Sequence, residues 1–253
     1  MADGMRRGVV YACSHPQWLG EAIVSAQSVR HHMPDLRRQL FITTDLLKAA
    51  GGGVHDHFTD VIPLEKLVHD HRPRFEATLQ TDLDQAVILD GDTLIVEPAY
   101  ELFELLDRFD IGVAQAPQYL SPRAVAMDLY AHLPKVSLAQ PEWNAGVIVA
   151  RPDERFRAMI REWSRLFGIS RALGFEMDQA AFRSAMVMSD LRIATLPNNY
   201  NFRAHVSQGV AGTVKILHAH GDLKAIARTI NANLQMRAYG PRSDLIHGFG
   251  PKR

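Results

Sequence analysis

Apolar and polar positions along the first half of the chain follow two alternating patterns. Short, continuous apolar runs predict buried strands, and stretches in which apolar residues recur every three or four positions predict helices. The predicted strands cover residues 8–13, 39–43, 87–89 and 111–116, and the predicted helices cover residues 18–32, 75–81 and 100–108. Strands that alternate with helices are typical of βαβ units, so the pattern predicts an α/β fold with a mixed, mostly parallel sheet flanked by helices.

The second half of the chain is less regular. Short apolar runs predict strands at 146–150 and 214–218, and an amphipathic pattern predicts a helix at 153–167. Residues 117–141 lack a clear period, and we expect a mobile loop over the functional site there. The stretch 237–253 contains glycine and proline and is expected to be a loosely packed C-terminal tail.

The composition excludes several classes of protein. A chain of 253 residues, 47% of them hydrophobic and 22% charged, can form one large globular domain. Its 28 basic and 28 acidic residues cancel, so no general attraction to nucleic acid is expected. Cys13 is the only cysteine, which excludes an intrachain disulfide. Residues 1–7 are polar, without an apolar segment long enough for a signal peptide or a membrane span, so we expect a cytoplasmic, soluble protein.

Two carboxylates follow the apolar run at 87–89. Asp90 and Asp92 are separated only by Gly91. Open α/β sheets bind ligands beyond the carboxyl ends of their strands, and Mg²⁺ or Mn²⁺ prefers carboxylate oxygens and keeps positions for substrate phosphates. The pair therefore indicates either a divalent metal site or a solvated polar turn.

A second group of polar residues follows the predicted strand at 214–218. His218 offers a nitrogen ligand for a metal, Gly221 allows the backbone to approach a phosphate, and Lys224 can neutralise a diphosphate. Together with the two aspartates, these residues indicate a site for a cation and a diphosphate.

Several motifs occur in a fixed order between about Val9 and Lys224. They are 28–32 (SVRHH), Arg74, 90–92 (DGD), 143–147 (WNAGV), 177–179 (MDQ), 196–201 (LPNNYN) and 218–224 (HxxGxxK). This ordered set resembles the GT-A-fold nucleotide-sugar glycosyltransferases, and within them glycosyltransferase family 8, which includes glycogenin and bacterial lipo-oligosaccharide galactosyltransferases. The resemblance implies one GT-A (Rossmann-like) domain over 1–236, with a nucleotide-binding part at about 8–116 and an acceptor-binding part at 117–236.

The resemblance also implies a metal-dependent retaining hexosyltransferase that uses a UDP-sugar and Mn²⁺ or Mg²⁺. Asp90, Asp92 and His218 would hold the metal, and Lys224 and the Gly221 backbone would stabilise the departing UDP. The residues expected to bind the donor are Tyr11, Ala12, Cys13, Trp18, Arg74, Gly91, Asn144, Ala145, Gly221 and Lys224. The family often continues Lys-Pro-Trp after this lysine, whereas Ala225 and Ile226 follow here, so the side that binds the acceptor hydroxyl is expected to differ.

The resemblance implies that Asp178 and Gln179 lie beside the donor sugar. Asp178 would accept hydrogen bonds from sugar hydroxyls, Gln179 would lie near the reacting face, and Lys224 completes the expected catalytic group. Because an amide is a poor nucleophile, we expect retention by a front-face route, in which a diphosphate oxygen helps to deprotonate the acceptor. Asp178 has an alternative role as the N-cap of the helix through Ala180 and Phe182.

Other interpretations fit parts of the pattern. A haloacid-dehalogenase-like phosphohydrolase also has two aspartates after a strand, but it has Thr or Val where this chain has Leu94. A catalytically silent nucleotide-sugar-binding protein is the third alternative. The histidine pairs at 55–57 and 69–71 lack a matching third ligand and are interpreted as solvated loops. Trp18 either anchors the first helix in the core or packs against uracil.

Overall fold

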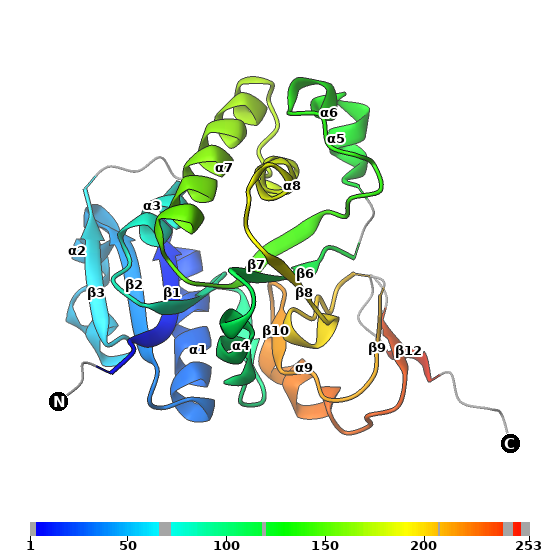
Figure 1. Cartoon of the computed structure of the whole chain (residues 1–253). Coiled ribbons are helices and arrows are strands. Elements are labelled where there is room, and N and C mark those ends of the chain that lie inside the picture. Colours follow the sequence, from blue (N-terminus) through cyan, green and yellow to red (C-terminus); the bar gives the residue numbers. More distant parts are fainter. Residues whose placement is uncertain (1–3, 66–71, 118–119, 207, 240–244, 249–253) are drawn as a thin grey trace, which may run out of the picture.

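The computed structural model describes residues 4–65, 72–117, 120–206, 208–239 and 245–248. Its centre is a seven-stranded sheet in the order β3-β2-β1-β4-β7-β6-β8 (Figure 1). Parallel pairs join β1 to β2 and β4, β2 to β3, and β6 to β8, whereas β7 is antiparallel to both β4 and β6, which confirms the predicted mixed, mostly parallel sheet. The strands are β1 (Arg7–Cys13), β2 (Arg37–Thr43), β3 (Asp60–Leu64), β4 (Gln85–Leu89), β6 (Ile111–Gln115), β7 (Trp143–Ala150) and β8 (Ile193–Leu196).

Helices cover both faces of this sheet, with α7 and α8 on one side and α1 and α4 on the other (Figure 1). Successive strand side chains point to opposite faces, so Val10 and Ile88 pack in one buried cluster with α3, α7 and α8, while Val9 and Val87 pack in another with α1 and α4. The helices are α1 (Pro16–His32), α2 (Thr44–Ala50), α3 (Arg72–Gln80), α4 (Glu101–Glu104), α7 (Glu154–Ala172) and α8 (Gln179–Met188), with short 3₁₀ helices η1 (Gly52–Asp56), η2 (Leu105–Asp107) and η3 (Asn198–Tyr200).

Two smaller sheets lie beside the main one. In the first, β5 (Thr93–Ile95) pairs antiparallel with β10 (Ile216–His218). The second has the order β12-β11-β9, formed by β9 (Gln208–Val210), β11 (Arg237–Tyr239) and β12 (Leu245–Gly248). A third buried cluster joins these elements to α9 (Leu223–Ile230) through Leu94, Leu217 and Leu223.

The structure departs from the sequence prediction in two places. The segment 117–141, expected to be a mobile loop over the site, contains two short helices, α5 (Pro122–Ala126) and α6 (Leu129–His132), which bury Ala124 and Leu129 against the core. The beginning of the expected loose tail is packed: Arg237 in β11 is 2% exposed, and its guanidinium donates to the carbonyls of Gln235 and Gly212.

The main sheet changes its strand order at β1. The chain passes from β1 outward to β2 and β3 and then returns to β4 on the other side of β1. Ligands in open α/β sheets bind at such a reversal, beyond the carboxyl ends of the two strands. Here those ends are Cys13 and Leu89, immediately before Asp90.

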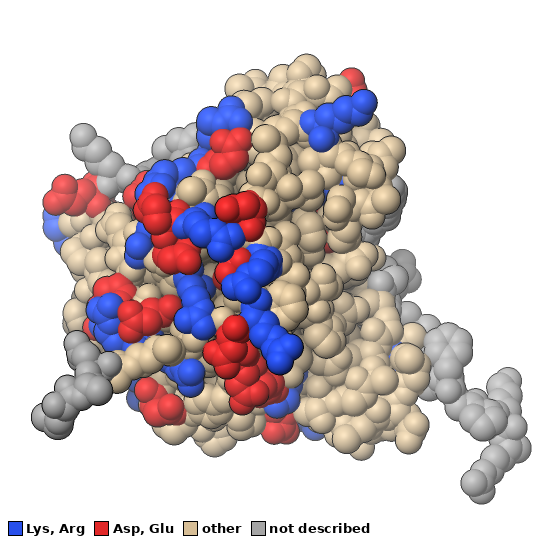
Figure 2. Space-filling view, in the orientation of Figure 1, with Lys and Arg blue, Asp and Glu red and all other residues tan. Residues whose placement is uncertain are grey.

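The surface carries mixed rather than one-signed charge. Figure 2 shows acidic and basic side chains interleaved over one part of the face and hardly any over the rest. Several exposed groups are paired, including Arg6 with Asp82 and Arg161 with Glu154. Among the described residues, no helix combines the length and apolar character needed to cross a membrane.

Candidate functional site

A cavity of about 280 Å³ opens at the carboxyl ends of β1 and β4. The ends of these strands form part of its wall, and the N-terminal ends of β7 and α8 form another part. Most of the residues predicted from the sequence line it: Tyr11, Ala12, Trp18, Arg74, Asp90, Gly91, Asp92, Asn144, Ala145, Asp178, Gln179 and His218. Segments far apart in the chain therefore meet at the point where the strand order reverses.

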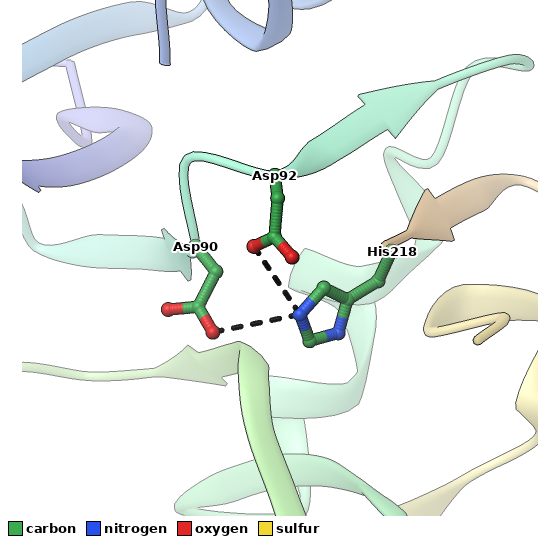
Figure 3. A group of neighbouring side chains, drawn as sticks. All are labelled: Asp90, Asp92 and His218. Atoms are coloured by element: carbon green, nitrogen blue, oxygen red, sulfur yellow. Dashed lines mark ion pairs between the residues drawn. The ribbon is translucent and has the colours of Figure 1, made fainter. Parts of the chain in front are cut away.

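Asp90, Asp92 and His218 lie together in this cavity (Figure 3), and this group of two acidic residues and a histidine is called the acidic triad below. Asp90 follows β4, Asp92 precedes β5, and His218 ends β10, whose antiparallel register places it opposite Thr93. His218 Nε2 lies 3.6 Å from Asp90 Oδ2 and 3.4 Å from Asp92 Oδ1. One ligand atom from each residue lies within 4.8 Å of the others, so the three can converge on one ion.

Hydrogen bonds hold the His218 ring with Nε2 toward the aspartates. Asn201 Nδ2 donates to Asn144 Oδ1 at 2.9 Å, which leaves Asn201 Oδ1 facing His218 Nδ1 at 2.8 Å. Because an amide oxygen only accepts, His218 Nδ1 donates to Asn201 Oδ1, and this bond turns Nε2 toward the two carboxylates. Metal-binding histidines are commonly oriented in this way. Asn201 therefore positions a candidate metal ligand.

Negative charge predominates around the cavity. Its lining has four carboxylates and two arginines. With neutral histidines, this leaves an excess of two negative charges, which one divalent cation would neutralise. These residues are Glu21, Asp90, Asp92, Asp178, Arg74 and Arg203. Burial opposes ionisation of Asp92, but its interactions with His218 outweigh burial and lower its pKa to about 2. Two carboxylates and an imidazole nitrogen that face one another fit a hard divalent cation such as Mn²⁺ or Mg²⁺.

Arg74 links this triad to Asp178. Its guanidinium forms an ion pair with Asp90 and lies 3.6 Å from Asp178 Oδ2. Burial opposes the charge on Arg74, but the nearby Asp90 and Asp178 outweigh burial and raise its pKa. Arg74 therefore remains charged and holds the two carboxylates in a fixed relation.

Gly146 is expected to be essential for the position of His218. A Cβ at residue 146 would overlap the imidazole, 2.8 Å from Nε2 and nearer to two other ring atoms. In Gly146→Ala we therefore expect His218 to be displaced and Mn²⁺ affinity to fall about tenfold or more, since disturbing even the groups that orient ligands costs that much. Calorimetric titration with Mn²⁺ measures the loss.

Gly168→Ala is the matched control for this prediction. Gly168 lies in α7, and an added Cβ would meet nothing within 4 Å. Alanine favours a helix over glycine by about 0.5–1 kcal/mol, so this variant should be more stable and bind Mn²⁺ normally. Equal Mn²⁺ affinity in both variants would contradict the role of Gly146.

The comparisons with known proteins establish the fold. No family model matches the sequence, and no curated protein matches it either. Among solved structures, apo mouse xyloside xylosyltransferase 1 superposes with a TM-score of 0.56 at 14% identity, over 85% of this chain and 97% of the other. The galactosyltransferase LgtC, in complex with donor and acceptor sugar analogs, gives a TM-score of 0.56 at 14% identity, over 85% of this chain and 87% of the other.

The chain has the GT-A fold. A further structure, the glycosyltransferase GlyE of Streptococcus pneumoniae TIGR4, matches with a TM-score of 0.54 at 16% identity, over 79% of this chain and 48% of the other. The xylosyltransferase and LgtC are family 8 glycosyltransferases. The likeness that the ordered motifs implied is thus confirmed at the level of the GT-A fold.

Within the GT-A fold, Asp178 occupies the N-cap position of α8 without capping it. Its side chain makes no cap hydrogen bond. Instead, Asp178 faces the cavity, and its buried Oδ2 has no hydrogen-bond partner among the described residues. The alternative interpretation of Asp178 as a helix cap is therefore wrong, and its carboxylate lies at the cavity beside the Arg74 guanidinium.

Three of the predicted donor-binding residues do not line the main cavity. Cys13 is buried beside it, and burial raises its pKa to about 12. Gly221 and Lys224 line a neighbouring cavity of about 400 Å³, which shares Glu21, Gly91 and Asp92 with the main one. Trp18, by contrast, lines the main cavity and is absent from the buried clusters, so it is not a core anchor.

Further residues lie around this cavity. The sequence leaves His220 open between a group that supports the metal ligands and a surface residue, and it does not predict Glu21, Arg203 or Glu142. Glu21 and His220 contact each other at 3.1 Å, and His220 Nδ1 lies 3.5 Å from Asp92 Oδ2, which places it next to the triad rather than away from it. Arg203 lines the cavity two residues after Asn201, and Glu142 lies behind Gln179. The only signal for these residues in the sequence is that they lie within a few positions of Trp18, His218 and the LPNNYN and WNAGV motifs.

The histidine pair at 55–57 contributes no ligand to this site. His57, from the first pair, lies outside the cavity, with its Nδ1 3.4 Å from Gln27 Nε2. The second pair, at 69–71, lies outside the described residues.

Proposed function

We propose that this chain is a metal-dependent retaining glycosyltransferase that transfers a hexose from a UDP-sugar to an acceptor hydroxyl. The observation that carries the proposal is the acidic triad in the cavity at the strand-order reversal of a GT-A fold. Transfer from a nucleotide sugar builds negative charge on a diphosphate, and a site that fits a divalent cation is suited to that charge.

The lining of the cavity supports a division of roles. A bound Mn²⁺ or Mg²⁺ would neutralise the donor diphosphate and make UDP a better leaving group. Asp90, Asp92 and His218 are the ligands in this proposal, and Asp178 accepts hydrogen bonds from the sugar. Tyr11, Ala12 and Trp18 bind the nucleoside; Asn144 and Ala145 line the sugar pocket.

Retention follows a front-face route in this proposal. The bond between the anomeric carbon and the diphosphate oxygen breaks, the acceptor oxygen bonds to the same face of that carbon, and the acceptor proton passes to the diphosphate. Arg74 fixes Asp178 relative to Asp90, so the protein contributes positioning and electrostatic stabilisation rather than a nucleophile.

Lys224 and Gly221 remain part of the proposal as groups that approach the diphosphate from the neighbouring cavity. Lys224 lies in the first turn of α9, and that cavity adjoins Asp92. A lysine there would stabilise the departing UDP as a point charge.

A panel of UDP-sugars with Mn²⁺ tests the proposal. We expect slow release of UDP with one donor, faster release when a suitable hydroxyl acceptor is added, and a product of retained anomeric configuration by NMR. Release of phosphate from simple monoesters would favour a phosphohydrolase, and binding without turnover would favour a nucleotide-sugar-binding protein. An inverted product would exclude the retaining mechanism.

A further inference from the structure

A buried carboxylate lies directly behind Gln179. Glu142, immediately before β7, has an exposed fraction of 0%. No arginine, lysine or histidine among the described residues forms an ion pair with it. A fully buried acid without a basic partner is costly unless its oxygens accept hydrogen bonds.

Both Glu142 oxygens accept such bonds. Gln179 Nε2 donates to Glu142 Oε2 at 2.6 Å, and the Tyr130 hydroxyl donates to Glu142 Oε1. Tyr130 comes from α6, within the segment that was expected to be a mobile loop, and Gln179 is the first residue of α8. The carboxylate is thus held from two sides.

This contact determines which end of the Gln179 amide faces the cavity. An amide has a donating NH₂ end and an accepting oxygen end. Both Glu142 oxygens act as acceptors, so Gln179 presents its NH₂ end to Glu142 and its Oε1 points away from that carboxylate. Gln179 lines the cavity, and no donor among the described residues bonds to its Oε1.

We propose that Glu142 is a positioning residue for the donor sugar, which holds the Gln179 carbonyl oxygen, rather than its NH₂ group, toward the reacting carbon. The inference rests on the proposed glycosyl transfer. An oxygen at this place accepts a hydrogen bond from a sugar hydroxyl. It also favours the positive charge that develops at the anomeric carbon as UDP departs, whereas an NH₂ group would oppose that charge.

Glu142→Gln is the direct test, because glutamine has nearly the same shape but can both donate and accept. It no longer selects one orientation of Gln179. We expect UDP affinity to be unchanged, the extra affinity conferred by the sugar to fall, and kcat to fall about tenfold or more, the effect of one charge-assisted hydrogen bond. Calorimetry with UDP and with the active UDP-sugar, together with kcat and KM, measures these effects.

Two controls separate positioning from a structural role. Tyr130→Phe removes the other hydrogen bond of Glu142 but keeps the amide orientation, so it should lower the melting temperature and leave kcat within about threefold. In a Gln179→Ala background, Glu142→Gln should have no further effect on kcat/KM, because Glu142 acts through Gln179.

Specific results would overturn the inference. Wild-type kcat and wild-type sugar affinity in Glu142→Gln, or additive effects in the double variant, would contradict it while leaving the glycosyltransferase proposal intact. Failure of the wild-type protein to bind or turn over any UDP-sugar would contradict the proposed function itself. If Glu142→Gln does not fold, NMR of the wild-type Gln179 side-chain NH₂ decides: the NH₂ protons should show no direct contact with the bound UDP-sugar, and such a contact would overturn the inference.

Discussion

Asp92→Asn is expected to abolish Mn²⁺-dependent UDP binding while the fold survives. The substitution keeps the shape of the side chain but removes one of the two carboxylate charges that face His218 Nε2. Loss of a group that merely orients a metal ligand costs 10- to 100-fold in affinity, so loss of a charged ligand should cost about 100-fold or more. Calorimetric titration of UDP in the presence of Mn²⁺ measures the effect.

Asp128→Asn is the matched control for Asp92→Asn. Asp128 is exposed, and its φ of 51° lies in the left-handed region, which asparagine tolerates well. The same chemical change should therefore leave UDP binding and the melting temperature unaltered. If Asp92→Asn bound UDP with wild-type affinity in the presence of Mn²⁺, the assignment of Asp92 as a metal ligand would be contradicted.

Asp178→Asn is expected to lower kcat about 100-fold or more with little change in stability. The Asp178 side chain makes no cap hydrogen bond, so α8 loses no capping energy when the charge is removed. The residue lines the cavity, its buried Oδ2 lies 3.6 Å from the Arg74 guanidinium without a hydrogen-bond partner among the described residues, and the proposal assigns the carboxylate to the sugar. Turnover of the active UDP-sugar and thermal melting provide the two measurements.

Asp153→Ala gives the opposite pattern. Asp153 is a true N-cap, whose side chain accepts from the Phe156 N–H at 2.9 Å. Its loss should cost about 1 kcal/mol of stability and leave kcat unchanged. If Asp178→Asn behaved like Asp153→Ala, the carboxylate would be structural rather than part of the sugar pocket.

The sequence predicted the central sheet where strands are buried on both faces. β4 and β7 are such strands, and their continuous apolar runs distinguish them from surface segments. β3 was not predicted, because it is a partly exposed edge strand that contains Pro63. β5 and β9 have only three residues each, and their stability comes from pairing with distant segments, which no local pattern reveals.

The candidate site was predictable where its residues lie in ordered motifs. Asp90, Asp92 and His218 belong to two such motifs, and the structure brings them together. Glu142 and Arg203 belong to the site through tertiary packing, so their residue type and spacing carry little local signal. Lys224 shows the reverse case: its motif is clear, yet it lies beside the main cavity rather than in it.

The pairing of β5 with β10 joins two regions that are far apart in the chain. A cation bound at this pairing would raise the local stability of both strands. Asp92 directly precedes one strand and His218 ends the other, so a cation held by both would fasten the small C-terminal cluster to the central sheet. A ligand that binds only when β5 and β10 are paired lowers the fraction of molecules in which this cluster is locally unfolded. Backbone amides of β10 and α9 should therefore exchange with deuterium more slowly when Mn²⁺ is added, whereas those of β2 should not change.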